Sequence, residues 1–95
     1  MSKLVDESKY EQLLNPLRGW VIEDSLLTKQ FQFSSYLDGV AFAKRCGELA
    51  DEMNHHPDLL IQWRKVTVSI TTHSAGGLTG LDFEYAGKVE KGTAI

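Results

Sequence analysis

The three histidines of this chain, which all lie between positions 55 and 73, are the residues best suited to chemistry. His55 and His56 are adjacent and are followed at once by Pro57, and His73 lies further along the chain. Imidazole has an unperturbed pKa of about 6.5, so it can give or accept a proton near neutral pH. Two or three imidazoles around one site can supply both the acid and the base of a reaction. The pattern therefore predicts a proton-transfer site.

Each histidine also has a structural explanation. A histidine near a helix C-terminus is favoured by the helix dipole by about 0.3–1 kcal/mol. That accounts for one member of the His55-His56 pair, but not for two adjacent histidines followed by a proline that fixes the backbone. His73 could be an exposed polar strand end or a side chain held at a ligand site by a rigid strand. Both explanations stay open on residue type alone.

A metal site and a cysteine site are less consistent with the sequence. Three histidines can bind catalytic zinc, but adjacent histidines chelate one ion poorly, so we expect no metal. The single cysteine, Cys46, lies on an apolar side of a predicted helix and is expected in the core. One cysteine cannot form an internal disulfide, which is typical of a reducing compartment.

Carboxylates and tryptophans could complete a histidine site. Asp82 is expected at the third position of a helix capped by Thr79, and such a residue can also line a pocket. Asp51, in the last turn of the long predicted helix, is unfavourable toward the helix dipole. It could orient a histidine, or it could be a plain solvent-facing acid. Trp20 and Trp63 could stack on a planar ring or pack in the core.

Apolar periodicity and turn residues predict helices and strands in the order helix, strand, strand, helix, strand, strand, helix, over residues 6–14, 19–24, 26–33, 34–54, 58–63, 65–73 and 78–92. The strand 65–73 is the clearest, because Val66, Val68 and Ile70 alternate with polar residues. Short connections between strands favour hairpins. We therefore predict an α+β fold, with a four-stranded antiparallel sheet and helices packed on one face.

Length and charge limit the class of protein. A chain of 95 residues suits one domain over 1–95 with a thin core, for which oligomerisation is a reasonable expectation. The net charge is −3 and no basic run is present, so a nucleic-acid partner is not expected. The N-terminal residues lack the apolar stretch of a secretory signal, and no run approaches the roughly 20 apolar residues that span a bilayer. We expect a cytoplasmic protein without membrane contact.

The spacing of these residues resembles the signature of the pterin-4a-carbinolamine dehydratases. That signature has an acidic residue, three others, His-His-Pro, an aromatic residue, a further histidine and an aspartate. The chain supplies these positions as Asp51, His55, His56, Pro57, Trp63, His73 and Asp82. The sequence "RGW" at 18–20 and the order of elements extend the resemblance over nearly the whole chain. At the acidic position this chain has aspartate where glutamate is frequent.

The resemblance implies a lyase, a cofactor-free dehydratase of 4a-hydroxytetrahydropterin (4a-hydroxytetrahydrobiopterin) that forms quinonoid dihydropterin during tetrahydropterin recycling. It implies that His55, His56 and His73 line the pocket around C4a of the pterin. His55 and His73 would then carry the proton transfers, and His56 would be a positioner or second acid. Which histidine is the acid and which is the base stays open.

The resemblance also implies residues that contact or support the substrate. Asp82 would hold an imidazole or hydrogen-bond the amide edge of the pterin, and Asp51 would orient a histidine. Trp20 would pack against the pterin ring, and Pro57 is the fourth residue expected at the substrate. The family's fold is α+β with a four-stranded antiparallel sheet. Its members pair edge strands into homodimers and can stack helices into homotetramers.

Other functions stay open beside this one. The substrate arises when an aromatic amino acid hydroxylase oxidises tetrahydropterin, so the resemblance implies a functional link to such an enzyme. Animal relatives also act as partners of a homeodomain transcription factor. A non-catalytic binding module of the coactivator type is therefore the alternative. A metal-dependent hydratase, and a divergent role where no hydroxylase occurs, are further hypotheses.

Overall fold

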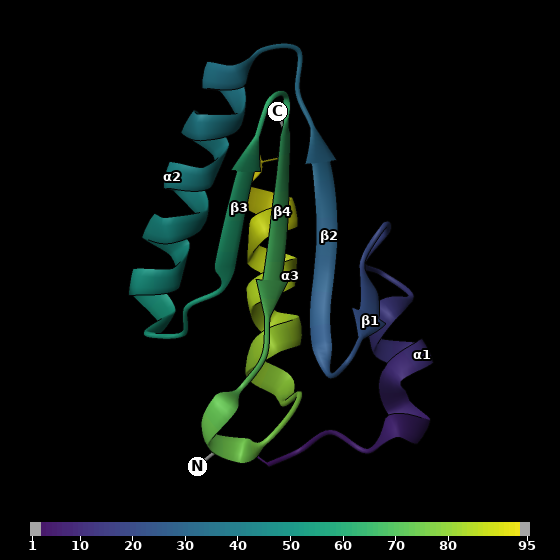
Figure 1. The fold of residues 1–95 in the computed structure, drawn as a ribbon. Helices are drawn as coiled ribbons and strands as arrows, with labels where there is room; N and C mark the ends of the chain where they lie inside the picture. Colours follow the sequence, from purple (N-terminus) through teal and green to yellow (C-terminus); the bar gives the residue numbers. More distant parts are fainter. Residues whose placement is uncertain (1–2, 94–95) are drawn as a thin grey trace.

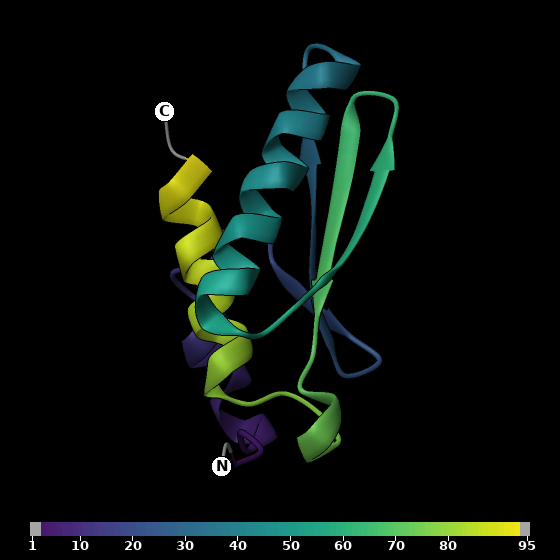
Figure 2. The ribbon, with the colours of Figure 1, turned by 90° about the vertical axis from the view of Figure 1, so that its left-hand side faces the viewer.

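Residues 3–93 are described by a computed structural model, in which one antiparallel sheet carries helices on one of its faces (Figures 1 and 2). The strand order is β1-β2-β4-β3. The strands are β1 (Val21–Glu23), β2 (Leu26–Gln32), β3 (Asp58–Gln62) and β4 (Lys65–Ile70). The helices are α1 (Tyr10–Leu14), α2 (Tyr36–Met53) and α3 (Gly80–Thr93), with 3₁₀ turns η1 (Glu7–Lys9) and η2 (His73–Ala75). The predicted α+β fold is confirmed.

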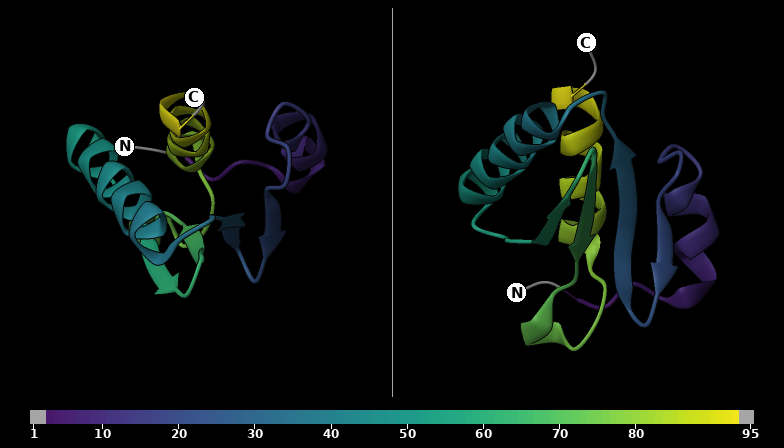
Figure 3. Two further views of the ribbon diagram at one scale, coloured as in Figure 1. Left: turned by 90° about the horizontal axis from the view of Figure 1, so that it is seen from above. Right: turned by 45° about the horizontal axis from the view of Figure 1, so that its top comes forward.

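The core lies between β4 and the two longer helices. Val66, Val68 and Ile70 are each at most 1% exposed, because the pleat of this central strand turns them toward the helices. The alternate residues Thr67 and Ser69 lie on the opposite face, over which Figure 3 shows no helix within the described residues. The alternation of apolar and polar residues in the sequence therefore identified the covered face of the sheet correctly.

Turn and cap chemistry explains where the elements begin and end. The β1–β2 hairpin turns on Asp24 and Ser25, which both have positive φ, as a type I′ turn requires. Ser35 Oγ accepts the Asp38 N–H at the start of α2, at 3.1 Å. The Asp38 carboxylate accepts the Ser34 hydroxyl instead of reaching back to the Ser35 N–H, so only one of the two bonds of a capping box forms.

Strand β4 ends at Ile70, three residues before the end predicted from the sequence. The cause is the Thr72 carbonyl, which accepts the N–H groups of Ala75 and Gly76 and so turns the chain into η2. His73 opens this turn and is not part of the strand. The alternation rule holds only while the backbone stays extended, so it could not predict where His73 points.

Cys46 lies in the core, as predicted, and contributes to the packing of α2 on α3. The side chain is 0% exposed, and the Tyr85 hydroxyl donates to the Cys46 carbonyl at 2.7 Å. Burial, which disfavours the thiolate, raises the pKa of the Cys46 thiol to about 11. Burial also raises the pKa of Tyr85. Among the described residues, no helix is long and apolar enough to cross a membrane.

The raised pKa of Cys46 leads to a prediction about stability at alkaline pH. An unfolded thiol titrates at its ordinary value of 9.0, so between pH 9 and about 11 unfolding releases a proton that the folded state retains. The free energy of unfolding is expected to fall as pH rises through this window, by less than about 1.4 kcal/mol per pH unit. Urea unfolding of the wild type and Cys46→Ala at intervals from pH 8 to 11 measures this. Equal slopes for the two proteins would contradict the prediction.

Candidate active site

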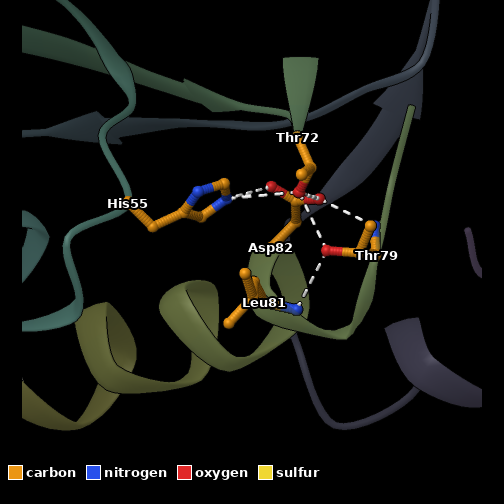
Figure 4. A network of polar contacts seen from close by, with 5 residues as sticks. All are labelled: His55, Thr72, Thr79, Leu81 and Asp82. Atoms are coloured by element: carbon orange, nitrogen blue, oxygen red, sulfur yellow. Dashed lines mark hydrogen bonds and ion pairs between the residues drawn. The ribbon is translucent and has the colours of Figure 1, made fainter. Parts of the chain in front are cut away.

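His55 is held at the C-terminal end of α2 by a helix-ending motif of the Schellman type. Asn54 adopts the left-handed conformation, with φ of 51°. The His55 N–H donates to the Ala50 carbonyl at 3.1 Å, and the Asn54 N–H donates to the Asp51 carbonyl at 3.2 Å. The chain therefore leaves the helix along a fixed path, and this path carries the imidazole toward the start of α3 (Figure 4).

A buried carboxylate meets this imidazole. His55 Nε2 lies 2.6 Å from Asp82 Oδ1, and the Asp82 side chain is 0% exposed. The His55 side chain is 12% exposed, so the pair is largely screened from water. The carboxylate can only accept, so Nε2 of a neutral His55 carries the proton and Nδ1 carries the lone pair. Within residues 3–93, Nδ1 has no hydrogen-bond partner, which leaves it available to a ligand.

Asp82 also completes the cap of α3, as predicted. The Thr79 N–H donates to Asp82 Oδ2 at 2.8 Å, and Thr79 Oγ1 accepts the Leu81 N–H at 3.2 Å. These two bonds are reciprocal, as in a capping box, although the hydroxyl accepts from the second helical residue and not from the third. Thr72 Oγ1 donates to the same carboxylate oxygen at 2.8 Å. The carboxylate thus accepts three hydrogen bonds, and its position is determined by the start of the helix (Figure 4).

His56 faces solvent and has a carboxylate of its own. His56 Nε2 lies 2.8 Å from Asp51 Oδ1, with the two side chains 56% and 83% exposed. Exposed pairs of this kind contribute little to stability. The contact can still orient the ring. Each of the two adjacent histidines thus has its own carboxylate, Asp82 for His55 and Asp51 for His56. Pro57 follows the pair and precedes β3.

His73 is exposed and lines a hollow of about 370 Å³. The other residues around this hollow are Asp24, Ser25, Leu26, Thr71, Gly76 and Gly77. His55 and His56 do not line it. The backbone nevertheless links the histidines closely, because Thr72, the residue before His73, contacts the carboxylate that holds His55. A single cavity shared by all three imidazoles stays a prediction.

The two tryptophans lie away from the histidines. Trp20 is 4% exposed, and its indole Nε1 donates to Glu90 Oε2 at 2.9 Å, in the core beside α3. Glu90 is eight residues beyond Asp82, about 12 Å along the helix axis. Trp63 is 74% exposed in the β3–β4 turn, at the end of the sheet opposite η2 in Figure 1. Trp20 therefore presents no ring face to the histidines of this chain.

Thr72 is the residue that the sequence reading missed. Position 72 continues the inward-facing series 66, 68 and 70, so the sequence alone predicts that its hydroxyl points toward the apolar face of the sheet. A buried hydroxyl needs a hydrogen-bond partner, and this requirement could have indicated an adjacent polar group. Within the part of the chain that the structure describes, no three side chains of His, Cys, Asp or Glu are grouped closely enough to hold a metal ion.

Comparisons with known proteins identify the family to which this chain is similar. The family model for pterin 4 alpha carbinolamine dehydratase matches residues 3–92. Putative pterin-4-alpha-carbinolamine dehydratases of Roseiflexus castenholzii and Sulfolobus acidocaldarius are similar in sequence. The first is 41% identical, with 96% of this chain and 98% of the relative covered. The second is 39% identical, with 92% and 96% covered.

Solved structures are similar as well. A transcriptional coactivator/pterin dehydratase from Brucella melitensis has a TM-score of 0.86 at 29% identity, covering 92% of this chain and 95% of its own. A pterin dehydratase-like RuBisCO assembly factor of the alpha-carboxysome has a TM-score of 0.65 at 22% identity, covering 78% and 88%, which shows a shared fold. By the family match and the identity over nearly its full length, the chain belongs to the pterin-4a-carbinolamine dehydratase family.

Proposed function

We propose that this protein is a lyase that removes water from 4a-hydroxytetrahydropterin, such as 4a-hydroxytetrahydrobiopterin, and releases quinonoid dihydropterin for tetrahydropterin recycling. Family membership supports the reaction class. The observation that carries the proposal is the contact between His55 and the buried Asp82, at 2.6 Å. A carboxylate that accepts from one ring nitrogen keeps the proton of a neutral imidazole on that nitrogen. The other nitrogen then has a lone pair that can take part in proton transfer.

The reaction needs two proton transfers and no change in redox state. The C4a–O bond breaks, and the departing hydroxide takes a proton from an acid to become water. N5 gives its proton to a base, and its electron pair forms the C4a=N5 double bond. We assign these two transfers to His55 and His73, and we propose His56 as a positioner or second acid. Each well-placed transfer contributes about 10²–10⁴-fold to the rate.

The supporting residues follow from their contacts. Both oxygens of Asp82 are engaged by protein donors, so we propose that it holds His55 and does not bond the amide edge of the pterin. Asp51 would orient His56 in the same way. Pro57 would set the backbone next to the pterin. We leave Trp20 out of the pterin contacts because its ring is buried elsewhere.

The proposal is tested by following the decay of a 4a-carbinolamine generated in solution, with and without the purified protein. This substrate also dehydrates spontaneously, so the rate without protein must be subtracted. We expect decay above background that is proportional to protein concentration and saturates with substrate. A rate equal to the background at every protein concentration would overturn the proposal.

A binding module of the coactivator type is the second candidate. The similar Brucella melitensis structure is described as a transcriptional coactivator as well as a pterin dehydratase. A purely non-catalytic module would not need the buried Asp82–His55 pair. Absence of turnover in the decay assay, together with a folded protein, would favour this candidate.

We also propose that the protein forms a homodimer or a homotetramer, acts in the cytoplasm and is functionally linked to an aromatic amino acid hydroxylase. The edge strand β3 supports dimerisation, because Leu60 and Ile61 are 56% and 38% exposed beside unpaired backbone groups. The exposed Tyr36 and Leu37 on α2 support a further contact between helices.

The dimer leads to a prediction for β3. Leu60→Lys is expected to shift the protein from dimer to monomer at micromolar concentration, because a lysine on an edge strand opposes pairing with a second copy. Sedimentation velocity measures the change. Gln30→Lys, which adds the same charge at an exposed position of the central strand β2, is the control. A wild type that sediments as a monomer at every concentration would contradict the dimer.

A further inference from the structure

Thr72 has a backbone that is fixed on both sides. It lies between β4 and η2, and its side chain is 6% exposed. The Thr72 N–H donates to the Gly77 carbonyl at 3.1 Å, and the Gly77 N–H donates back at 3.3 Å. The Thr72 carbonyl also accepts from Ala75 and Gly76, at 3.0 and 3.1 Å. These bonds fix the direction of the Cα–Cβ bond, so the position of the hydroxyl depends on χ1 alone, which is stiff in a β-branched residue.

The hydroxyl belongs to a chain of hydrogen bonds that all point toward one carboxylate oxygen. The Leu81 N–H donates to Thr79 Oγ1, which lies 2.8 Å from Thr72 Oγ1. Thr72 in turn donates to Asp82 Oδ2 at 2.8 Å. Since the Thr72 proton goes to the carboxylate, the Thr79 hydroxyl must donate to Thr72. Hydrogen bonds aligned in this way strengthen one another.

These bonds determine which way the carboxylate faces. Oδ2 is held by the Thr72 hydroxyl and the Thr79 N–H, so Oδ1 stays directed at His55 Nε2. The Thr79 donor is a backbone N–H group, which only a substitution by proline would remove. Thr72 is therefore the one side chain among the described residues that holds Oδ2. Its own contact with His55 Nε2, at 3.4 Å, is too long to take over the role of the carboxylate.

We propose that Thr72 is a positioning residue of this site: its hydroxyl orients Asp82, and Asp82 keeps His55 in the form with the proton on Nε2 and a free lone pair on Nδ1. His73 directly follows Thr72 in the chain, so Thr72 also links His73 to His55, the two histidines assigned to proton transfer. The consequence for turnover rests on the proposed dehydratase function. The consequence for the His55 tautomer rests only on the contacts described above.

The test compares Thr72→Val, which removes the hydroxyl at nearly the same volume, with Thr72→Ser, which retains it. We expect Thr72→Val to lower kcat by about 10- to 100-fold with little change in KM, because a small displacement of a catalytic group has effects of this size. Thr72→Ser is expected to restore most of the rate. Thr67→Val is the matched control and should leave kcat unchanged, since the buried Thr67 Oγ1 has no hydrogen-bond partner among the described residues.

A second readout does not depend on activity. Long-range ¹H–¹⁵N correlation spectra of the protein without substrate report which ring nitrogen of His55 is protonated. We expect the Nε2–H form in the wild type, Thr72→Ser and Thr67→Val, and a mixture of the two tautomers in Thr72→Val. If the wild type shows no dehydration, the proposed function fails, while these spectra still decide the role of Thr72.

Two outcomes would overturn the inference. One is a folded Thr72→Val with the wild-type His55 tautomer. The other is a Thr72→Ser variant as impaired as Thr72→Val, because serine retains the hydroxyl and the rate would then not depend on it. If circular dichroism shows that Thr72→Val does not fold, Thr72→Ala takes its place, and a Thr72→Ala variant equal to Thr72→Ser in both readouts would also overturn it.

Discussion

Replacing Asp82 by asparagine is expected to lower kcat for carbinolamine dehydration by about 10²–10⁴-fold, the range that proton transfer by a positioned side chain contributes. The amide oxygen of the new residue can still accept from Thr79 and Thr72, so the cap of α3 is retained. Its NH₂ group would then face His55 Nε2. A donor in that place forces the proton of a neutral imidazole onto Nδ1, so Nδ1 no longer carries the lone pair. The steady-state rate, corrected for spontaneous dehydration, measures the loss.

The control for Asp82→Asn is Asp38→Asn. Asp38 occupies the same position of its own helix, third after the capping residue. Within residues 3–93, its carboxylate accepts only a serine hydroxyl and contacts no histidine. Asp38→Asn should leave kcat unchanged. An equal loss of rate in the two variants, or a folded Asp82→Asn with the wild-type rate, would show that the carboxylate does not act through His55.

His73→Ala is expected to remove most of the turnover and to leave stability nearly unchanged. The His73 side chain is exposed and makes no hydrogen bond to another described side chain. Its removal should change the free energy of unfolding by at most about 0.5 kcal/mol, as for most surface substitutions. If His73 carries one of the proton transfers, kcat should fall by about 10²–10⁴-fold. Steady-state kinetics and urea unfolding of the same preparation give both quantities.

Ser74→Ala is the matched control for His73→Ala, because Ser74 is the exposed neighbour in the same 3₁₀ turn. It should retain both the rate and the stability of the wild type. Turnover in His73→Ala equal to that of Ser74→Ala would remove His73 from the proposed site. Because the hollow that His73 lines does not include His55, this outcome would also separate the two regions functionally.

Local interactions along the chain explain why most of the fold could be predicted. The alternation in 65–70 identified the face of β4 that is covered, since side chains in a strand alternate between the two faces. Thr79 with Asp82 marked the start of α3, because a capping box involves residues only three apart. The predicted β4 is longer than the observed strand, because the Ala75 and Gly76 N–H groups donate to the Thr72 carbonyl and end the strand.

The family motif likewise identified His55, His56, His73 and Asp82 as candidates, and the identities and spacings of these residues were available without any coordinates. Which carboxylate contacts which histidine could not be predicted from the sequence. Asp82 could have bonded a pterin or a histidine, and only the packing of α2 and β4 around the start of α3 brings His55 Nε2 within 2.6 Å of it. This contact joins residues 27 positions apart, so no local pattern encodes it.

The sequence by itself therefore determined the order of the elements and the cap of α3, since these depend on neighbours within about four positions. The family motif supplied the candidate site residues. The tertiary structure decided that Asp82 faces His55 and Asp51 faces His56, that Thr72 orients the first of these carboxylates, and that Trp20 lies in the core. The reason is physical: a buried hydroxyl or carboxylate must find partners, and which groups lie within reach is settled only when distant segments pack together.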